Sequence, residues 1–195
     1  MKPMFLVLLL STTLAYSQAT LKVERITRKE GIEPGMGVIY GSFVQRLNLF
    51  STKGPQHVFL KNLETGDLHS CQMNVEGRET RFFFQLPPGI YAIVRYNYSK
   101  IGWGTKDAIY SEPVLKGIDT SDPQFKASRA AGKINPYQVE HYTFAVEPDR
   151  LHYVGTWHFD TAAVHFKDHK FTLDEVVKNK YTKLDFETAI REIPQ

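Results

Sequence analysis

Cysteine is almost absent from this chain of 195 residues, and its scarcity limits both the stabilisation and the chemistry open to the protein. Cys71 is the single cysteine, so no disulfide can form within the chain and a packed core must stabilise the fold. No lysine or arginine adjoins this thiol in the run DLHSCQMNV. We therefore interpret Cys71 as a small buried apolar side chain and not as a nucleophile.

The chain also lacks an apolar run long enough to span a membrane, which needs about 20 residues. Its most apolar stretch, Met4–Leu10, follows Lys2 and precedes the more polar segment STTLAYSQA. This order is typical of a secretory signal peptide, and small residues allow cleavage after Ser17 or after Ala19. We therefore predict a signal peptide over residues 1–19, a mature chain without a transmembrane segment, and export to the periplasm or the extracellular space.

Motifs for nucleic acids, nucleotides and hydrolysis are missing as well. The formal net charge is +3 and the charges are scattered, so nothing predicts a nucleic-acid partner. Neither G-x-x-x-x-G-K-[ST] nor G-x-G-x-x-G occurs, and no nucleotide cofactor is indicated. There is no G-x-S-x-G, and Ser42 lies within a predicted strand. We predict that the protein is not an enzyme and binds no cofactor.

Histidines keep one catalytic alternative open, because His152, His158, His165 and His169 lie in a short C-terminal stretch. Two histidines four residues apart bind one metal ion only when they lie on a helix. The alternation in VHFKDHKF instead predicts a strand, which separates its histidines by about 13 Å. We place no metal site here, and a secreted metal-assisted hydrolase that uses these histidines remains the alternative function.

The segment Thr80–Ser99, TRFFFQLPPGIYAIVRYNYS, is the one around which we expect the fold to be organised. It predicts a strand, a turn at Pro87-Pro88-Gly89 and a second antiparallel strand. Bulky residues on both faces of each arm indicate a central hairpin that is covered from two sides. In the second arm, the alternation places Tyr96 and Tyr98 opposite Tyr91 and Ile93.

Further short strands at a spacing of roughly 8–12 residues, each bounded by turn signals, predict an antiparallel β-sandwich. They include an edge strand at Thr20–Lys29, a strand with a bulge or close approach at Gly41, and a hairpin closed at Glu64-Thr65-Gly66. The fold class is mainly β. We assign residues 20–172 to the sandwich domain.

Helices are expected only near the C-terminus, in a helical appendage at residues 173–195. Thr172 with Glu175 forms a capping signature at its start, and Asp185–Ile193 has an apolar face at helical spacing. In contrast, Lys116–Pro136 is polar and punctuated by glycine and proline. We predict a structureless loop there, either disordered or functional.

Aromatic residues offer a candidate ligand site at one end of the central hairpin, beside a glycine-rich loop. Rings can pack on the apolar faces of sugars or peptides while their polar tips stay wet, and a nearby arginine adds an anion contact. The alternative interpretation is that the same rings close the core. The candidate ligand-binding residues are Arg95, Tyr96, Tyr98, Trp103 and Tyr110.

Two segments suggest a family. LPPGIYAIVRY resembles the Pro-Gly-x-Tyr strand of carboxypeptidase regulatory-like and transthyretin-like sandwiches. FAVEPDRLHYVGTWHF, with Pro148, Tyr153 and Gly155, resembles an element of secreted bacterial proteins of unknown function built on that sandwich. The likeness covers roughly Val38–Phe159. It implies a transthyretin-like or immunoglobulin-like sandwich in the periplasm or the extracellular space, and it implies no reaction. Our leading hypothesis is an exported cell-envelope binding or accessory domain without catalytic activity, whose partner is an envelope protein, a peptide or a glycan.

Overall fold

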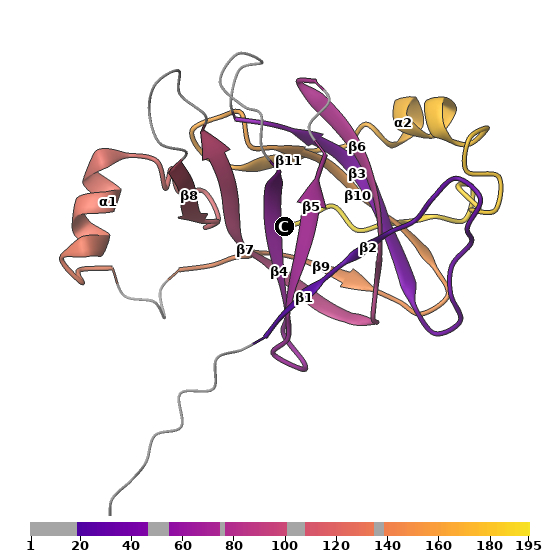
Figure 1. Ribbon diagram of the computed structural model, residues 1–195, viewed down its shortest axis with the longest axis horizontal. Coiled ribbons are helices and arrows are strands. Elements are labelled where there is room, and N and C mark those ends of the chain that lie inside the picture. Colours follow the sequence, from indigo (N-terminus) through magenta and orange to yellow (C-terminus); the bar gives the residue numbers. More distant parts are fainter. Residues whose placement is uncertain (1–18, 47–54, 75–76, 101–107, 135–138) are drawn as a thin grey trace, which may run out of the picture.

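The computed structural model describes residues 19–46, 55–74, 77–100, 108–134 and 139–195, and in it two β-sheets pack face to face (Figure 1). Most of the regular structure is strand, with two short helices among the described residues. The predicted mainly β sandwich is therefore confirmed. The predicted signal peptide lies outside the described residues except for its last position. No helix in the described ranges is long and apolar enough to cross a membrane.

Sheet I contains six of the described strands in the order β1-β5-β4-β7-β8, with β9 beside the first half of β7. These strands are β1 (Thr20–Lys22), β5 (Leu68–Met73), β4 (Gln56–Asn62), β7 (Gly89–Lys100), β8 (Ala108–Pro113) and β9 (Tyr142–Val146). The predicted hairpin at Glu64-Thr65-Gly66 is confirmed, because β4 and β5 pair antiparallel across it.

Sheet II also contains six described strands, in the order β11-β10-β3-β6-β2, with β12 beside the first half of β10. These strands are β11 (His165–Lys167), β10 (Leu151–His158), β3 (Gly37–Val44), β6 (Glu79–Leu86), β2 (Glu24–Arg25) and β12 (Ile190–Arg191). The pairs β1–β5, β3–β10 and β10–β12 are parallel. Both sheets are therefore mixed and not purely antiparallel as predicted.

The predicted central hairpin is wrong, because its two arms lie in different sheets. The first arm, β6, pairs with β3 and β2 in sheet II, and the second arm, β7, pairs with β4, β8 and β9 in sheet I. The chain crosses between the sheets at Pro87-Pro88, whose rings cannot donate to a ladder. Gly89 follows with φ +147°, where a Cβ would lie 2.6 Å from the Asn62 amide nitrogen. The sequence therefore predicts the turn at Pro87-Pro88-Gly89 correctly, but the two strands that this turn connects do not pair with each other.

The predicted edge strand at Thr20–Lys29 also divides between the sheets. Its first part, β1, joins sheet I and its second part, β2, joins sheet II. The N–H of Val23 donates to the Ser70 carbonyl in sheet I, and the N–H of Ile26 donates to the Phe83 carbonyl in sheet II. Both apolar side chains are buried, so this short segment closes one edge of the sandwich.

The side chains of β7 do not alternate as the sequence predicts. Tyr91 and Ile93 belong to the core between the sheets, and so do Tyr96 and Tyr98. The register with β4 shifts and leaves Val94 as an extra residue. A bulge of this kind turns every later side chain to the other face. The prediction that these two pairs of residues lie on opposite faces is therefore wrong.

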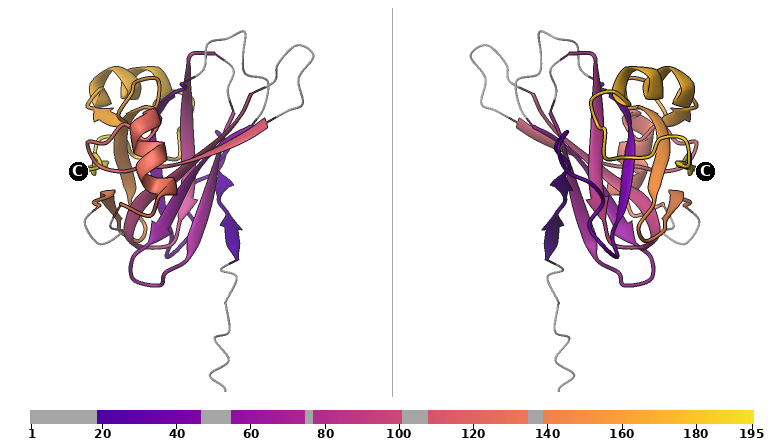
Figure 2. Two further views of the ribbon diagram at one scale, coloured as in Figure 1. Left: turned by 90° about the vertical axis from the view of Figure 1, so that its left-hand side faces the viewer. Right: turned by 90° about the vertical axis from the view of Figure 1, so that its right-hand side faces the viewer.

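A second apolar cluster covers the outer face of sheet II, beneath α2 (Lys170–Val177) and the C-terminal segment, on the side of the molecule away from β1 (Figure 2). Phe83 is buried there and its ring stacks on Tyr181 with centroids 3.9 Å apart. The hydroxyl of Tyr40 donates to Asp174 Oδ1 (2.6 Å), and the Lys170 ammonium donates to Asp174 Oδ2 (2.5 Å). The bond from Tyr40 of β3 holds α2 on the sheet, while the bond from Lys170 lies within the helix.

The helix predictions need two corrections. In the C-terminal region α2 begins at Lys170, ahead of the predicted cap at Thr172, and Asp185–Ile193 forms a turn followed by β12 in place of a second helix. Inside the predicted loop Lys116–Pro136, whose last two residues lie outside the described part, there is a helix, α1 (Pro123–Ala130). The carboxylate of its N-cap, Asp122, accepts the Gln124 N–H.

Candidate functional site

The aromatic residues of the predicted ligand site are divided between the core and the surface. Tyr96 is 1% exposed, and its hydroxyl donates to Gln56 Oε1 in the interior. Tyr98 is mostly buried and donates to Glu112 Oε1 (3.1 Å). Tyr110 is 41% exposed and stacks on Tyr98 with centroids 5.1 Å apart. Trp103 lies outside the described residues. The rings therefore form a stack that runs from the core to the surface.

Arg95 lies on the opposite face of β7, on the outer surface of sheet I. It pairs across the ladder with Phe59, while Asn97 pairs with His57 in the neighbouring position. The Arg95 guanidinium lies 4.0 Å above the centroid of the Phe59 ring. A planar cation over an aromatic ring is held in place by the ring quadrupole and by packing. The strand pairing thus builds a platform in the middle of the sheet, in which the guanidinium of Arg95 covers the buried ring of Phe59.

This platform lines a cleft of about 480 Å³ on the outer face of sheet I. His57, Phe59, Arg95 and Asn97 contribute to it from the two interior strands β4 and β7. Ile109 of β8, whose side chain is 77% exposed, lies at its border. The cleft therefore combines an aromatic base, polar side chains and an exposed apolar edge.

Two polar atoms of the cleft are not satisfied by the fold. Within the described part of the chain, neither Arg95 Nε nor Asn97 Oδ1 has a hydrogen-bond partner, although both atoms are buried. One is a donor and the other an acceptor. A buried polar atom without a partner costs about 1–3 kcal/mol, and such atoms in native proteins often mark sites that a ligand or water completes.

A serine and a histidine also meet in this cleft. His57 Nδ1 lies 3.0 Å from Ser70 Oγ. Burial, and secondarily the charge of Lys22, lowers the pKa of His57, so the ring is neutral near pH 7. A hydrolytic triad needs a third group that orients the histidine, and no described carboxylate bonds to His57. We interpret this pair as a structural link between β4 and β5.

The sequence indicated Arg95 but missed Phe59, His57 and Asn97 as parts of this surface. In HVFLKNL, His57 and Phe59 alternate with residues of the core, which is a signal that they face outward. Their meeting with Arg95 depends on the register between β4 and β7, which lie far apart in the sequence. No local sequence pattern predicts that register.

Comparisons with known proteins do not assign the chain to a family. No model of a known protein family matches it, and no curated protein matches it. A leucine-rich repeat protein from Bacteroides thetaiotaomicron aligns with 63% of this chain at 13% identity and a TM-score of 0.34. This chain spans about 14% of the length of that structure. The resemblance to transthyretin-like sandwiches stays a prediction.

The C-terminal histidines are only partly brought together. The rings of His158 and His165 stack with centroids 4.5 Å apart, and His158 Nδ1 lies 3.1 Å from Asp160 Oδ1. His169 is instead the residue before α2, beside Thr156. In the described ranges, no three or more His, Cys, Asp or Glu side chains form a group that could hold a metal ion. Among the described residues, this geometry therefore supplies no set of metal ligands for the alternative function, a metal-assisted hydrolase.

His152 is fully buried in β10, and the N–H of Glu147 donates to its Nε2 (3.0 Å). Burial lowers the pKa of His152 below its ordinary value, and the bonds and charge of Glu147 oppose that shift only in part. The folded protein thus holds this ring neutral, whereas in the unfolded chain it binds a proton near pH 6.5.

Stability should therefore fall as the pH decreases from about 7.5 to about 5.5, because the unfolded chain binds more protons than the folded one in this window. Urea denaturation at both pH values measures the effect. The variant His152→Gln should show a smaller loss across the same window. An equal loss in the variant and the original chain would show that His152 does not cause it.

Proposed function

We propose that this protein is an exported, non-catalytic domain that binds a neutral glycan in the cleft on the outer face of sheet I. One observation carries the proposal: a buried donor, Arg95 Nε, and a buried acceptor, Asn97 Oδ1, lack partners beside the flat platform of Arg95 and Phe59. Sugar hydroxyls donate and accept at once, and the apolar face of a pyranose packs on flat surfaces.

A glycan fits this surface better than a peptide. Peptides usually recognise sheets by adding a strand to an edge, where backbone groups are unpaired. The platform of Arg95 and Phe59 belongs instead to β4 and β7, which have neighbours on both sides. A ligand must therefore lie across the face of the sheet and contact side chains. A small rotation of Arg95 and Asn97 toward such a ligand would provide their missing partners.

Binding to an array of immobilised neutral oligosaccharides tests the proposal. We expect the chain to bind at least one class, and Arg95→Gln to weaken that binding roughly tenfold, equivalent to about 1.4 kcal/mol. Arg129→Gln is the matched control, because Arg129 is exposed on α1 and outside the cleft. No binding to any neutral glycan, or equal binding by the two variants, would refute the proposal.

Export makes a separate prediction. Cleavage after Ser17 or Ala19 leaves a mature chain that begins at Gln18 or Thr20. Mass spectrometry of the protein recovered from outside the cytoplasm should find one of these starts. An intact Met1 on the recovered protein would contradict the signal-peptide prediction without affecting the proposed cleft.

A further inference from the structure

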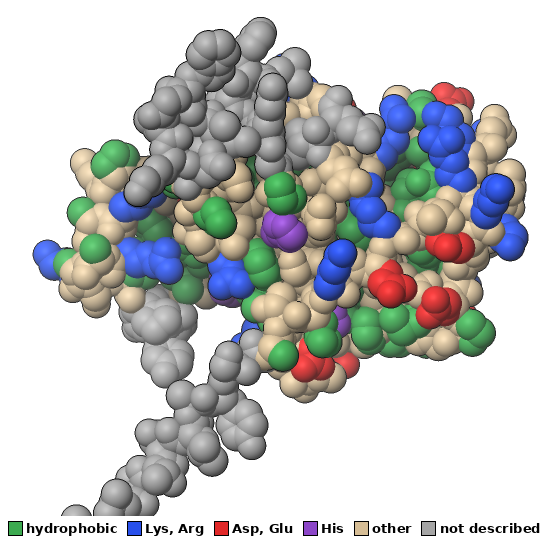
Figure 3. All heavy atoms as spheres, viewed as in Figure 1, with side chains coloured by type: hydrophobic (Ala, Val, Ile, Leu, Met, Phe, Trp, Pro, Cys, Tyr) green, Lys and Arg blue, Asp and Glu red, His purple; other side chains and the backbone are tan. Residues whose placement is uncertain are grey.

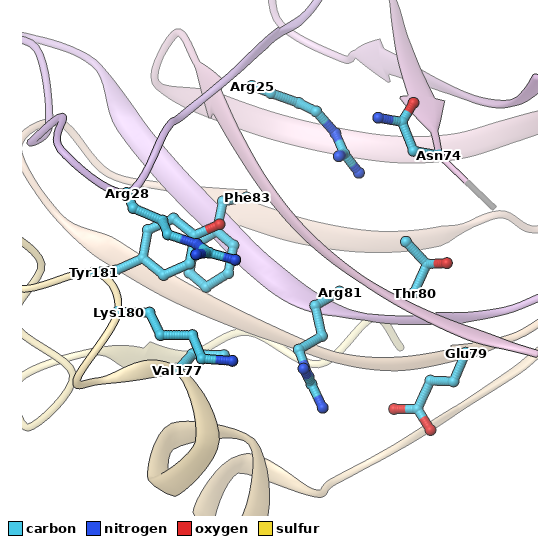
Figure 4. A pocket seen from close by; sticks show the side chains of 10 residues that line it. All are labelled: Arg25, Arg28, Asn74, Glu79, Thr80, Arg81, Phe83, Val177, Lys180 and Tyr181. Atoms are coloured by element: carbon cyan, nitrogen blue, oxygen red, sulfur yellow. The ribbon is translucent and has the colours of Figure 1, made fainter. Parts of the chain in front are cut away.

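A second concave surface lies on the other side of the sandwich, between β2, β6 and the end of α2 (Figure 4). It has a volume of about 330 Å³ and is lined by four cationic side chains from three segments. Arg25 and Arg28 come from β2 and the residues after it, Arg81 from β6, and Lys180 from the turn after α2. Glu79 is the one carboxylate among the lining residues. We call this surface the basic groove.

Three of the four cations of the basic groove, Arg28, Arg81 and Lys180, form no ion pair within the described part of the chain. Elsewhere, cations pair with carboxylates, as Arg46 does with Glu112 and Arg191 with Asp168. Among the described residues, by contrast, no carboxylate lies within 4.0 Å of the cationic groups of Arg28, Arg81 or Lys180. Figure 3 shows Lys and Arg side chains gathered around a hydrophobic hollow at the end of the molecule that carries α2.

The base of the groove is rigid. Phe83 and Val177 belong to the buried cluster of sheet II, and Tyr181 stacks on Phe83. The backbone positions that carry Arg81 and Lys180 are therefore fixed by the core, and both side chains line the same groove. Several like charges that line one concave surface raise its local electrostatic potential, and a bound anion lowers it. The basic groove therefore favours the binding of a negatively charged group.

We propose that the basic groove binds a small ligand that carries two or more adjacent anionic groups, either phosphates or carboxylates. Even without Arg25, three cations against one carboxylate leave an excess of two positive charges, more than one monovalent anion neutralises. Arginine forks match phosphate and carboxylate oxygens with paired hydrogen bonds. The volume suits a small molecule. The site lies on the opposite sheet from the glycan cleft and does not depend on it.

Calorimetric titration with pyrophosphate, citrate and acetate tests this assignment. We expect at least one of the two polyanions to bind, with a Kd at least about tenfold lower than that of acetate. If only pyrophosphate binds, the groove recognises phosphate groups, and if only citrate binds, it recognises carboxylates. If both bind, the groove accepts either kind of anionic group. Raising the salt from about 20 to about 200 mM should weaken the binding, because the Debye length shrinks roughly threefold.

The double variant Arg81→Gln with Lys180→Gln should raise the Kd of the bound polyanion at least about tenfold. The matched control is Lys61→Gln with Arg129→Gln, which removes the same charges from exposed positions outside the groove and should change the Kd less than about twofold. All four side chains are exposed, so both variants should fold, which circular dichroism verifies. Absence of polyanion binding, or an equal loss in the two double variants, would overturn the assignment.

Discussion

Replacing Phe84 or Phe83 with alanine should reduce the free energy of unfolding by similar amounts, about 3–5 kcal/mol for each variant. The two residues are neighbours on β6 and point to opposite faces of sheet II. Phe84 is fully buried between the sheets, and Phe83 is 3% exposed beneath the C-terminal segment. Because both faces of the strand are covered, both substitutions remove a buried ring and leave a cavity.

Urea denaturation of the two variants measures this. Phe171→Ala is the matched control: Phe171 lies on α2 with 74% of its side chain exposed, and its loss should cost less than about 0.5 kcal/mol. A domain of this size has a free energy of unfolding of about 5–15 kcal/mol, so either core substitution removes a large fraction of it. If Phe83→Ala behaved like Phe171→Ala, the outer face of sheet II would not be covered as described.

Gly41→Ala should also destabilise the protein strongly, by about 1–3 kcal/mol or more. Gly41 lies in β3, where a Cβ would come within 2.3 Å of the Gly155 carbonyl oxygen and 3.0 Å of the Phe82 ring. Gly155 belongs to β10, whose register with β3 shifts at this point. The methyl group would have to push a backbone oxygen of the neighbouring strand away, so the central pair of sheet II must separate.

Gly77→Ala provides the comparison, since no atom of the described residues lies within 4 Å of a Cβ built there. Its unfolding midpoint in urea should stay near that of the original chain, while that of Gly41→Ala should fall clearly below it. Equal midpoints would mean that β3 and β10 are not in close contact at Gly41. The sequence predicted a bulge or close approach at this glycine, and the structure confirms it.

Local signals predicted strands and turns well, but they did not predict which strands pair. The β4–β5 hairpin follows from its short turn, and it forms as predicted. Pro87-Pro88-Gly89 reverses the chain equally well within one sheet or between two, so nothing local decides that β6 and β7 separate. Which partner a strand chooses depends on burial of distant residues, and here β10 lies parallel to β3.

The helix errors have identifiable physical causes. An aspartate followed by a proline, as at Asp122-Pro123, is a helix-start signal, and here it outweighs the polar, glycine-punctuated composition that predicts a loop. At Asp185–Ile193 the apolar spacing suited a helix, but the Asp185 carboxylate accepts the N–H groups of Glu187 and Thr188 and forms a turn. The following residues then gain ladder bonds to β10, which outweigh a weak helical preference.

For the candidate site, the sequence indicated one residue of the platform, Arg95, by its place beside the tyrosines. Phe59 and Asn97 were missed because the platform exists only through the register between β4 and β7. The bulge at Val94 also decides that the tyrosines point inward while Arg95 points outward. A single extra residue in a strand leaves no clear mark in the alternation pattern.

The most direct test of the proposed glycan cleft is nuclear magnetic resonance of the Arg95 Nε–H group and the Asn97 side-chain amide. The probes are cellohexaose, mannohexaose and chitohexaose, added in turn to the mature chain labelled with nitrogen-15. If the cleft binds a neutral glycan, at least one probe should shift both resonances and leave the Arg129 Nε–H resonance unchanged. If every probe that binds leaves the Arg95 and Asn97 resonances unmoved, or if none of the three binds, the proposed cleft is contradicted.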